Sequence, residues 1–161
     1  MFFINGGRAL PREESIGVEL PRIMRYTGEG TGYGCWAVFE QATGAFVGWI
    51  MLVPPKGGTP DVPELGYRLR RSAWGQGYAT EGARALVRRA FTQLPTTRVF
   101  ATTMTVNHAS RRVMEKAGLH YVRTFFAEWP DRIPGDEFGD VEYAATREEW
   151  LGANPGPDTT A

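Results

Sequence analysis

A glycine-containing segment near the middle of the chain has the composition of a binding site for an anion. It reads Leu69-Arg70-Arg71-Ser72-Ala73-Trp74-Gly75-Gln76-Gly77-Tyr78-Ala79-Thr80-Glu81-Gly82. Glycine at positions 75 and 77 allows a ligand to approach the backbone closely and permits dihedrals that a Cβ disfavours. A helix that begins just after them offers four backbone N–H groups without intrahelical partners, and its dipole favours a phosphate or pyrophosphate. The segment predicts an anion-binding turn, with a tight turn that binds nothing as the alternative.

Two other side chains are suited to moving protons. Glu64 opens the segment 64–69, where apolar and polar residues alternate and Glu64 falls on the polar face. A carboxylate there can take a proton from an ammonium group directly or through a water, and the alternative is an ion pair with Arg68 or Arg70. Ser110, in the first turn of a later predicted helix, is the candidate proton donor; alternatively its hydroxyl only bonds the backbone.

The elements that must position these residues form a mixed β/α chain. Period-two patterns predict strands at residues 34–40, 45–53, 64–69, 98–104, 120–128 and 141–146. Helical spacing predicts helices at 79–94 and 107–117, and a first helix within 8–27 that is interrupted at Pro21 and packs on a core through Ile16, Leu20, Ile23 and Met24. A right-handed crossover makes strand 98–104 parallel to strand 64–69.

Local signals predict the ends of the later helices. Asn107 is suited to be an N-cap and Gly118 to be the left-handed residue after the helix. Thr146 and Glu149 have the spacing of a capping box, which predicts a last short helical turn at Trp150. Without internal repeats or a linker, residues 1–152 are expected to form a single domain and residues 153–161 a disordered tail.

The composition narrows the class of partner. Basic and acidic residues balance at 18 each among 161 residues, so we expect no nucleic-acid partner and no membrane partner. No apolar run is long enough to span a bilayer and no signal-peptide pattern is present, so we expect a cytoplasmic protein. The single cysteine, Cys35, has no partner for an intramolecular disulfide and is expected to be buried in a strand.

The order of motifs resembles the GNAT superfamily of acetyl-CoA-dependent N-acetyltransferases. The resemblance is carried by Trp74–Glu81, by Asn107–Gly118 with its Asn-x-x-Ser start, and by Glu142–Trp150. The first of these segments looks like the branch related to the ribosomal-protein alanine acetyltransferases. The resemblance implies an α/β (α+β) fold: a mixed, largely antiparallel central sheet with one splayed pair of parallel strands and flanking helices.

The resemblance also implies a site and an activity. Backbone N–H groups of about Gly75 to Thr80 would hold the pyrophosphate of coenzyme A, and Asn107 would bond its pantetheine arm between the two splayed strands. The residues expected at the coenzyme are Leu69, Arg70, Arg71, Trp74, Gly75, Gln76, Gly77, Tyr78, Ala79, Thr80, Asn107 and Ser110.

The implied reaction moves an acetyl group from acetyl-CoA to a primary amine by direct attack in a ternary complex. Glu64 would be the base and Ser110 the acid, no metal is needed, and the acceptor is a small-molecule or peptide amine. One alternative is a non-catalytic acyl-CoA-binding or sensing module. Another is a dinucleotide-binding domain, although no third glycine completes that fingerprint.

Three positions depart from the superfamily's pattern. The arginine or glutamine that usually precedes the phosphate turn falls at Ser72, and the tyrosine that many relatives use as general acid falls at Met114. Met1–Gly7 aligns with the first helical region, so we expect the first strand of the fold to be missing. An unpaired sheet edge would follow, which favours a homodimer.

Overall fold

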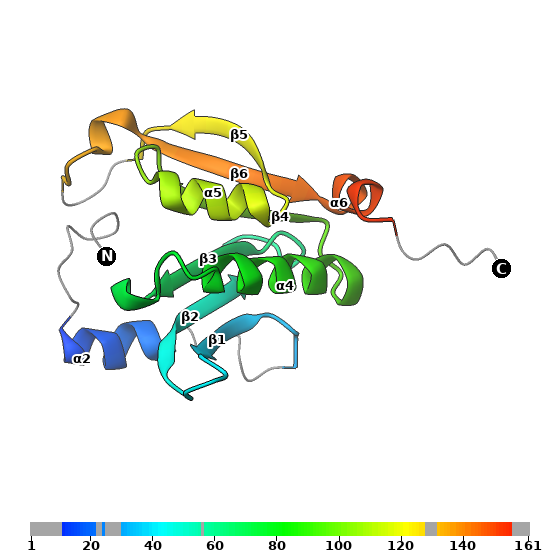
Figure 1. Cartoon of the computed structure of the whole chain (residues 1–161). Helices are drawn as coiled ribbons and strands as arrows, with labels where there is room; N and C mark the ends of the chain where they lie inside the picture. Colours follow the sequence, from blue (N-terminus) through cyan, green and yellow to red (C-terminus); the bar gives the residue numbers. More distant parts are fainter. Residues whose placement is uncertain (1–10, 22–23, 25–29, 56, 128–131, 156–161) are drawn as a thin grey trace.

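The computed structural model describes residues 11–21, 24, 30–55, 57–127 and 132–155. Within them, six strands form one sheet in the order β1-β2-β3-β4-β6-β5, and α4 and α5 lie side by side on one of its faces (Figure 1). Every neighbouring pair is antiparallel except β3 and β4. This arrangement confirms the predicted fold class. The strands are β1 (Gly34–Phe39), β2 (Phe46–Val53), β3 (Glu64–Leu69), β4 (Arg98–Met104), β5 (His120–Phe125) and β6 (Asp140–Thr146).

The parallel strands β3 and β4 part after a single point of contact. Their described ladder pairs Glu64 with Phe100 and goes no further, whereas β3 pairs with β2 along its whole length. Both strands end on the side of the sheet where α4 and α5 begin (Figure 1). The facing edges therefore carry backbone N–H and C=O groups that do not pair with each other across the gap, and such groups need solvent or a ligand as a partner.

Helix α4 (Tyr78–Gln93) covers the sheet next to this gap. It approaches β2 closely at Gly82, where a Cβ would lie 2.0 Å from Cδ1 of Ile50. Its apolar stripe forms the centre of the core against β2, β3 and β4. The buried members of the stripe are Ala83, Val87, Ala90 and Phe91.

The C-terminal end of α4 is held by a residue distant in sequence. Arg147 donates hydrogen bonds to the carbonyl oxygens of Phe91 (2.5 Å), Leu94 and Thr96 (2.9 Å). The last carbonyls of a helix have no intrahelical donors. One guanidinium therefore satisfies acceptors at the end of α4 and in the loop that follows, and it joins them to the start of α6 (Arg147–Ala153).

The predicted caps of the later helices are confirmed. Asn107 precedes α5 (His108–Lys116), and its side chain accepts a hydrogen bond from the Ser110 N–H at 3.3 Å. Gly118 follows α5 with φ of +89°. The capping box of α6 is present, with Thr146 and Glu149 bonding each other's backbone and side chain. Each of these interactions lies within one turn of chain, which is why the local sequence predicts it.

The prediction for the first helix is wrong in its packing. Residues 12–21 are helical, with α2 (Arg12–Glu14) running into a π-helical segment at Ser15–Glu19. Ile16, Leu20 and Met24 are 51%, 46% and 61% exposed, so they do not face the core as expected. A π-helical turn changes the angular spacing on which the 3.6-residue pattern depends. Leu20 and Pro21 remain helical, and Ile23 lies outside the described residues.

Several predicted boundaries also change. The fifth strand ends at Phe125 and not at residue 128, and the last helix runs through Ala153, so the expected tail cannot begin there. Cys35 is half-buried where burial was predicted, and that burial raises the pKa of its thiol. The expectation of a missing first strand concerns residues 1–7, which lie outside the described part of the chain.

Among the described residues, no helix has both the length and the hydropathy that crossing a bilayer requires.

Candidate functional site

The turn between β3 and α4 has the geometry that its glycines predict. After a short 3₁₀ turn at Arg71–Ala73, Gly75 and Gly77 adopt φ of +74° and +91°. A Cβ at either position would meet no heavy atom within 4 Å. The backbone conformation is thus what requires glycine, and the space outside the turn is open to a ligand. Within the described residues, no side chain caps the first turn of α4, so its N–H groups keep their capacity to donate.

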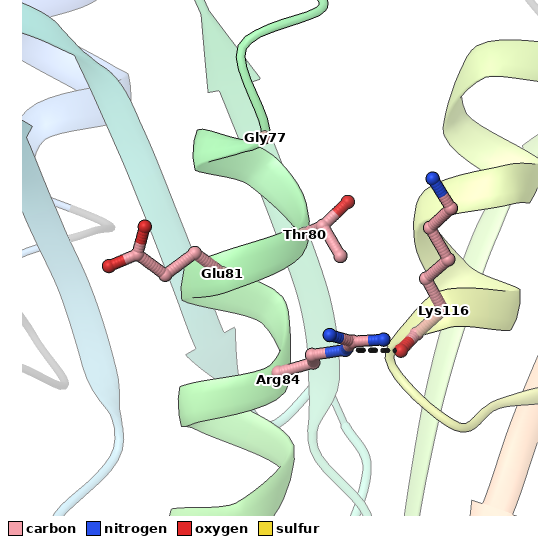
Figure 2. Close-up of a pocket in the computed structure, with 5 residues that line it drawn as sticks. All are labelled: Gly77, Thr80, Glu81, Arg84 and Lys116. Atoms are coloured by element: carbon pink, nitrogen blue, oxygen red, sulfur yellow. Dashed lines mark hydrogen bonds between the residues drawn. The ribbon is translucent and has the colours of Figure 1, made fainter.

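A pocket of about 520 Å³ opens beside this turn, between α4 and α5. Figure 2 shows Thr80 and Arg84 on the side of α4 that faces α5, while Glu81 points away from it. Arg84 Nε donates to the carbonyl oxygen of Lys116 at 2.7 Å, which bridges the two helices. The Lys116 side chain extends along α5 toward the level at which α4 begins (Figure 2). Two cationic side chains therefore line the same pocket as the start of α4.

Side chains within the turn bond mainly to the turn and to its neighbours. Gln76 donates to the Ser72 carbonyl at 2.8 Å, Trp74 Nε1 to the Leu69 carbonyl at 3.0 Å, and Arg70 Nη1 to the Phe46 carbonyl at 3.1 Å. These bonds fix the shape of the turn. The Arg70 guanidinium is thereby directed to β2, and Arg71 is exposed.

Tyr78, the first residue of α4, is tied to the β1–β2 hairpin. Its hydroxyl donates to Oε1 of Glu40 at 2.6 Å, and the Thr43 hydroxyl donates to the other carboxylate oxygen at 2.5 Å. The hydrogen bonds from Thr43 and Tyr78 lower the pKa of Glu40, and the bond to Glu40 raises the pKa of Tyr78. The start of α4 is thus held in place relative to the sheet.

Asn107 lies at the start of α5 and bonds both that helix and β4. Besides capping the helix, its Nδ2 donates to the Thr103 hydroxyl on β4 at 2.9 Å. An asparagine side chain has two N–H donors and an oxygen with two lone pairs. One donor and one lone pair of this side chain are not used by these two bonds.

Ser110, one turn further along α5, meets a tyrosine of β3. The Tyr67 hydroxyl lies 2.9 Å from the Ser110 hydroxyl and 2.9 Å from the Ser110 carbonyl oxygen. Burial raises the pKa of Tyr67 to about 12, so the phenol is neutral over the physiological range. This pair joins β3 to α5 on the helix-covered face of the sheet.

Glu64 lies on the opposite face. Side chains alternate along β3, so Glu64 is on the face away from Tyr67 and α5. Its Oε1 accepts a hydrogen bond from the Thr102 hydroxyl of β4 at 3.3 Å, directly beside the point where the strands part. The structure therefore places Glu64 and Ser110, the two predicted proton-moving residues, on opposite faces of the sheet and does not bring them into contact.

The comparison with known proteins assigns this arrangement to a family. The acetyltransferase (GNAT) domain family matches residues 9–120, which is more than half of the chain. The chain belongs to the GNAT acetyltransferase family. It is 44% identical over 151 residues to the FsC-acetyl coenzyme A-N(2)-transacetylase of Aspergillus fumigatus, an alignment that covers 90% of this chain and 63% of that protein. The chain spans less than two thirds of the length of the curated relatives it matches.

Solved GNAT structures share the fold. The structure of AAC(6′)-Ib in complex with Parmomycin and acetyl-CoA has a TM-score of 0.68 at 20% identity, over 98% of this chain and 85% of that one. The RimL ribosomal L7/L12 alpha-N-protein acetyltransferase in complex with coenzyme A has a TM-score of 0.66 at 20% identity, over 85% and 73%. At this level of identity, the likeness concerns the fold and not the substrate.

Met114 stands at the position where many GNAT proteins have a tyrosine, and its side chain is buried. Met114 is 2% exposed and belongs to the hydrophobic core. In this GNAT chain, a side chain at that point of α5 packs inward. The phenol that contacts Ser110 instead comes from β3.

Two parts of the site are missed by the sequence. Tyr67 is assigned there to the apolar set of its strand, although a buried tyrosine hydroxyl usually has a polar partner, and that is the signal that would have marked it. Arg84 belongs to no motif of the sequence. Its spacing of four from Thr80 places it on the same face of the helix, which is a usable signal, whereas the approach of Lys116 depends on tertiary packing.

A buried carboxylate on the sheet face away from α4 and α5 is a further feature that the sequence does not reveal. Glu142 on β6 is 7% exposed and bonds Arg98 of β4 at 2.5 Å and Arg123 of β5 at 2.8 Å. Burial acts to raise the pKa of Glu142, but the hydrogen bonds and charges of the two arginines outweigh it and hold that pKa below its usual value. These three residues, Arg98, Arg123 and Glu142, join three strands.

Within the described residues, no group of three or more His, Cys, Asp or Glu side chains has the geometry of a metal site.

Proposed function

We propose that this chain transfers an acetyl group from acetyl-CoA to a primary amine, by direct attack of the amine in a ternary complex. The observation that carries the proposal is the gap between β3 and β4, which opens beside a glycine turn with uncapped helix N–H groups. The named activity of the 44%-identical relative also supports it. Residues 1–152 would then act as one acetyltransferase domain.

The coenzyme would occupy the helix-covered side of the gap. Its pyrophosphate would accept hydrogen bonds from the N–H groups of Gly75 to Thr80, where a helix start favours anions. Arg84 and Lys116 would attract its further phosphate, because both lie in the pocket beside that turn. The amide-containing pantetheine arm would bond the exposed strand edges as a substitute strand and would use the remaining donor and lone pair of Asn107.

The acceptor amine would enter from the other face. Glu64, on that face, would take a proton from the ammonium directly or through a water, and the neutral nitrogen would attack the thioester carbon. Backbone N–H groups at the edge of β3 would stabilise the oxyanion. The C–S bond would then break, the nitrogen would lose its second proton to solvent, and the thiolate would leave next to Ser110. A thiol pKa of about 8.5 makes the thiolate a tolerable leaving group even with weak acid help.

The acceptor is proposed as a small-molecule amine. The relatives include an N(2)-transacetylase, whose name specifies a nitrogen acceptor, and an enzyme bound to the small molecule Parmomycin. A peptide amine is the second candidate, because the RimL alpha-N-protein acetyltransferase has the same fold and the Trp74–Glu81 segment resembles that branch.

The test is release of free thiol from acetyl-CoA over a panel of small-molecule and N-terminal peptide amines. Glu64→Gln is expected to lower the rate and to flatten its alkaline pH dependence, with coenzyme A affinity unchanged because Glu64 lies on the other face. Glu148→Gln, at an exposed position of α6, is the matched control and should behave as wild type. Binding of coenzyme A without turnover on any amine would favour the sensing module, and an unchanged pH profile in Glu64→Gln would exclude that residue as the base.

A further inference from the structure

The Tyr67 hydroxyl has more hydrogen-bond acceptors within reach than hydrogens to donate. The Tyr67 hydroxyl has a single hydrogen but two acceptors at the same distance, the Ser110 hydroxyl and the Ser110 carbonyl oxygen, each 2.9 Å away. If Tyr67 donates to the carbonyl, the Ser110 hydrogen points back at the phenol oxygen. If Tyr67 donates to the Ser110 hydroxyl, the Ser110 hydrogen is released to point elsewhere.

The two arrangements differ only in the rotation of two hydroxyl hydrogens. No heavy atom has to move, and the phenol keeps its hydrogen throughout because its pKa of about 12 lies well above that of a thiol. A serine in the first turn of a helix commonly bonds its own backbone, which would occupy its hydrogen. Here Tyr67 supplies the competing partner.

We propose that Tyr67 is a positioning residue that turns the Ser110 hydroxyl toward the departing thiolate. The negative charge on sulfur selects the arrangement in which Tyr67 donates to Ser110 and Ser110 donates to sulfur. Hydrogen bonds to charged groups are stronger than neutral ones, and a donor that itself receives a hydrogen bond is a better donor. Tyr67, on strand β3, thus takes over the assistance that Met114, a core residue of helix α5, cannot give.

This inference rests on the proposed acetyl transfer and adds a residue to it. The chain also holds a matched control, the Tyr33 hydroxyl, which lies 3.0 Å from the Thr96 hydroxyl. Tyr33 and Thr96 are 6% and 0% exposed and belong to the core beside α4, away from the start of α5. Tyr33→Phe therefore removes a hydroxyl pair of the same kind without touching the gap.

The experiment compares Tyr67→Phe, Ser110→Ala, the double variant and Tyr33→Phe in the thiol-release assay. Tyr67→Phe is expected to lower kcat about tenfold, the size of one hydrogen bond to a charged group, with the KM for acetyl-CoA unchanged. In Ser110→Ala, the further loss of the Tyr67 hydroxyl should have no effect on kcat, because Tyr67 acts only through Ser110. Tyr33→Phe should keep the wild-type kcat.

A second readout needs no turnover. The thiol pKa of bound coenzyme A, followed by the ultraviolet absorbance of the thiolate, should rise by about one in Tyr67→Phe, which is the equivalent of the tenfold effect. The role of Tyr67 would be overturned, and the proposed function left standing, if Tyr67→Phe kept the wild-type kcat and thiol pKa. It would also be overturned if the two single losses of kcat multiplied in the double variant. Absence of thiol release by the wild type would instead contradict the proposed function. The thiol pKa of bound coenzyme A in Tyr67→Phe would still test the role of Tyr67.

Discussion

Replacing Gly77 by alanine tests whether the left-handed residue before α4 aims the helix N–H groups at the coenzyme. Gly77 has φ of +91°, and a Cβ there would meet nothing within 4 Å. The substitution therefore changes backbone preference without creating a clash. A residue with a Cβ in the left-handed region costs about 1–2 kcal/mol, and we expect the free energy of unfolding to fall by about that amount.

The same strain should appear in coenzyme affinity. If the chain relieves it by rotating the peptides around position 77, the N–H groups of the first turn no longer converge. Binding must then restore the strained form. A cost of about 1–2 kcal/mol corresponds to a rise in Kd for coenzyme A of about 5- to 30-fold. Calorimetric titration with coenzyme A measures the affinity, and urea denaturation measures the stability.

Gly57→Ala is the matched control for this substitution. Gly57 has φ of +77°, also has nothing within 4 Å of a built Cβ, and lies in the loop at the opposite end of β3 from the turn. It should lose similar stability and keep the wild-type Kd. If Gly77→Ala also kept that Kd while losing stability, the reasoning about the turn would be refuted. Equal weakening by Gly57→Ala would show that general destabilisation was the cause.

Two further predictions concern the framework. Arg147→Met removes the donors from the end of α4 and should lower the free energy of unfolding by about 2–4 kcal/mol in urea, whereas Arg112→Met, at an exposed position of α5, should change it by less than about 0.5 kcal/mol. Glu142→Gln should destabilise the chain at neutral pH. Because the folded-state pKa of Glu142 is depressed, this contribution is present above the unfolded carboxyl pKa of about 4.3 and is lost as the pH falls through the lower folded value. The stabilities of wild type and variant should therefore converge as the pH falls through that lowered value, and a gap that persisted below it would contradict the assignment.

Interactions between residues close in sequence could be predicted well. The bounds of β3 and β4, the Asn107 cap and the Thr146 capping box match the structure, because alternation and capping depend on side chains a few residues apart. The glycine turn follows for the same reason, since a left-handed backbone needs glycine whatever surrounds it. The separation of β3 from β4, by contrast, is predicted only by the resemblance to the GNAT superfamily and not by any property of the two segments themselves.

The first helix shows the limit of such patterns. Ile16, Leu20 and Met24 recur at helical spacing, but the pattern does not say which surface they meet, and the structure leaves them exposed. Whether a stripe is buried depends on the position of other elements. That position is decided by packing over the whole chain.

The chemistry of the gap divides along the same line. The sequence by itself determined that an anion-binding turn leads into a helix and that Glu64 and Ser110 are groups able to move protons. Only the tertiary structure decided that they lie on opposite faces of the sheet and that Tyr67, 43 positions from Ser110, reaches its hydroxyl. It also brought the Lys116 carbonyl of α5 within hydrogen-bond distance of Arg84 on α4. Hydrogen bonds act over about 3 Å in space, and only the folded chain brings residues so far apart in sequence within that distance.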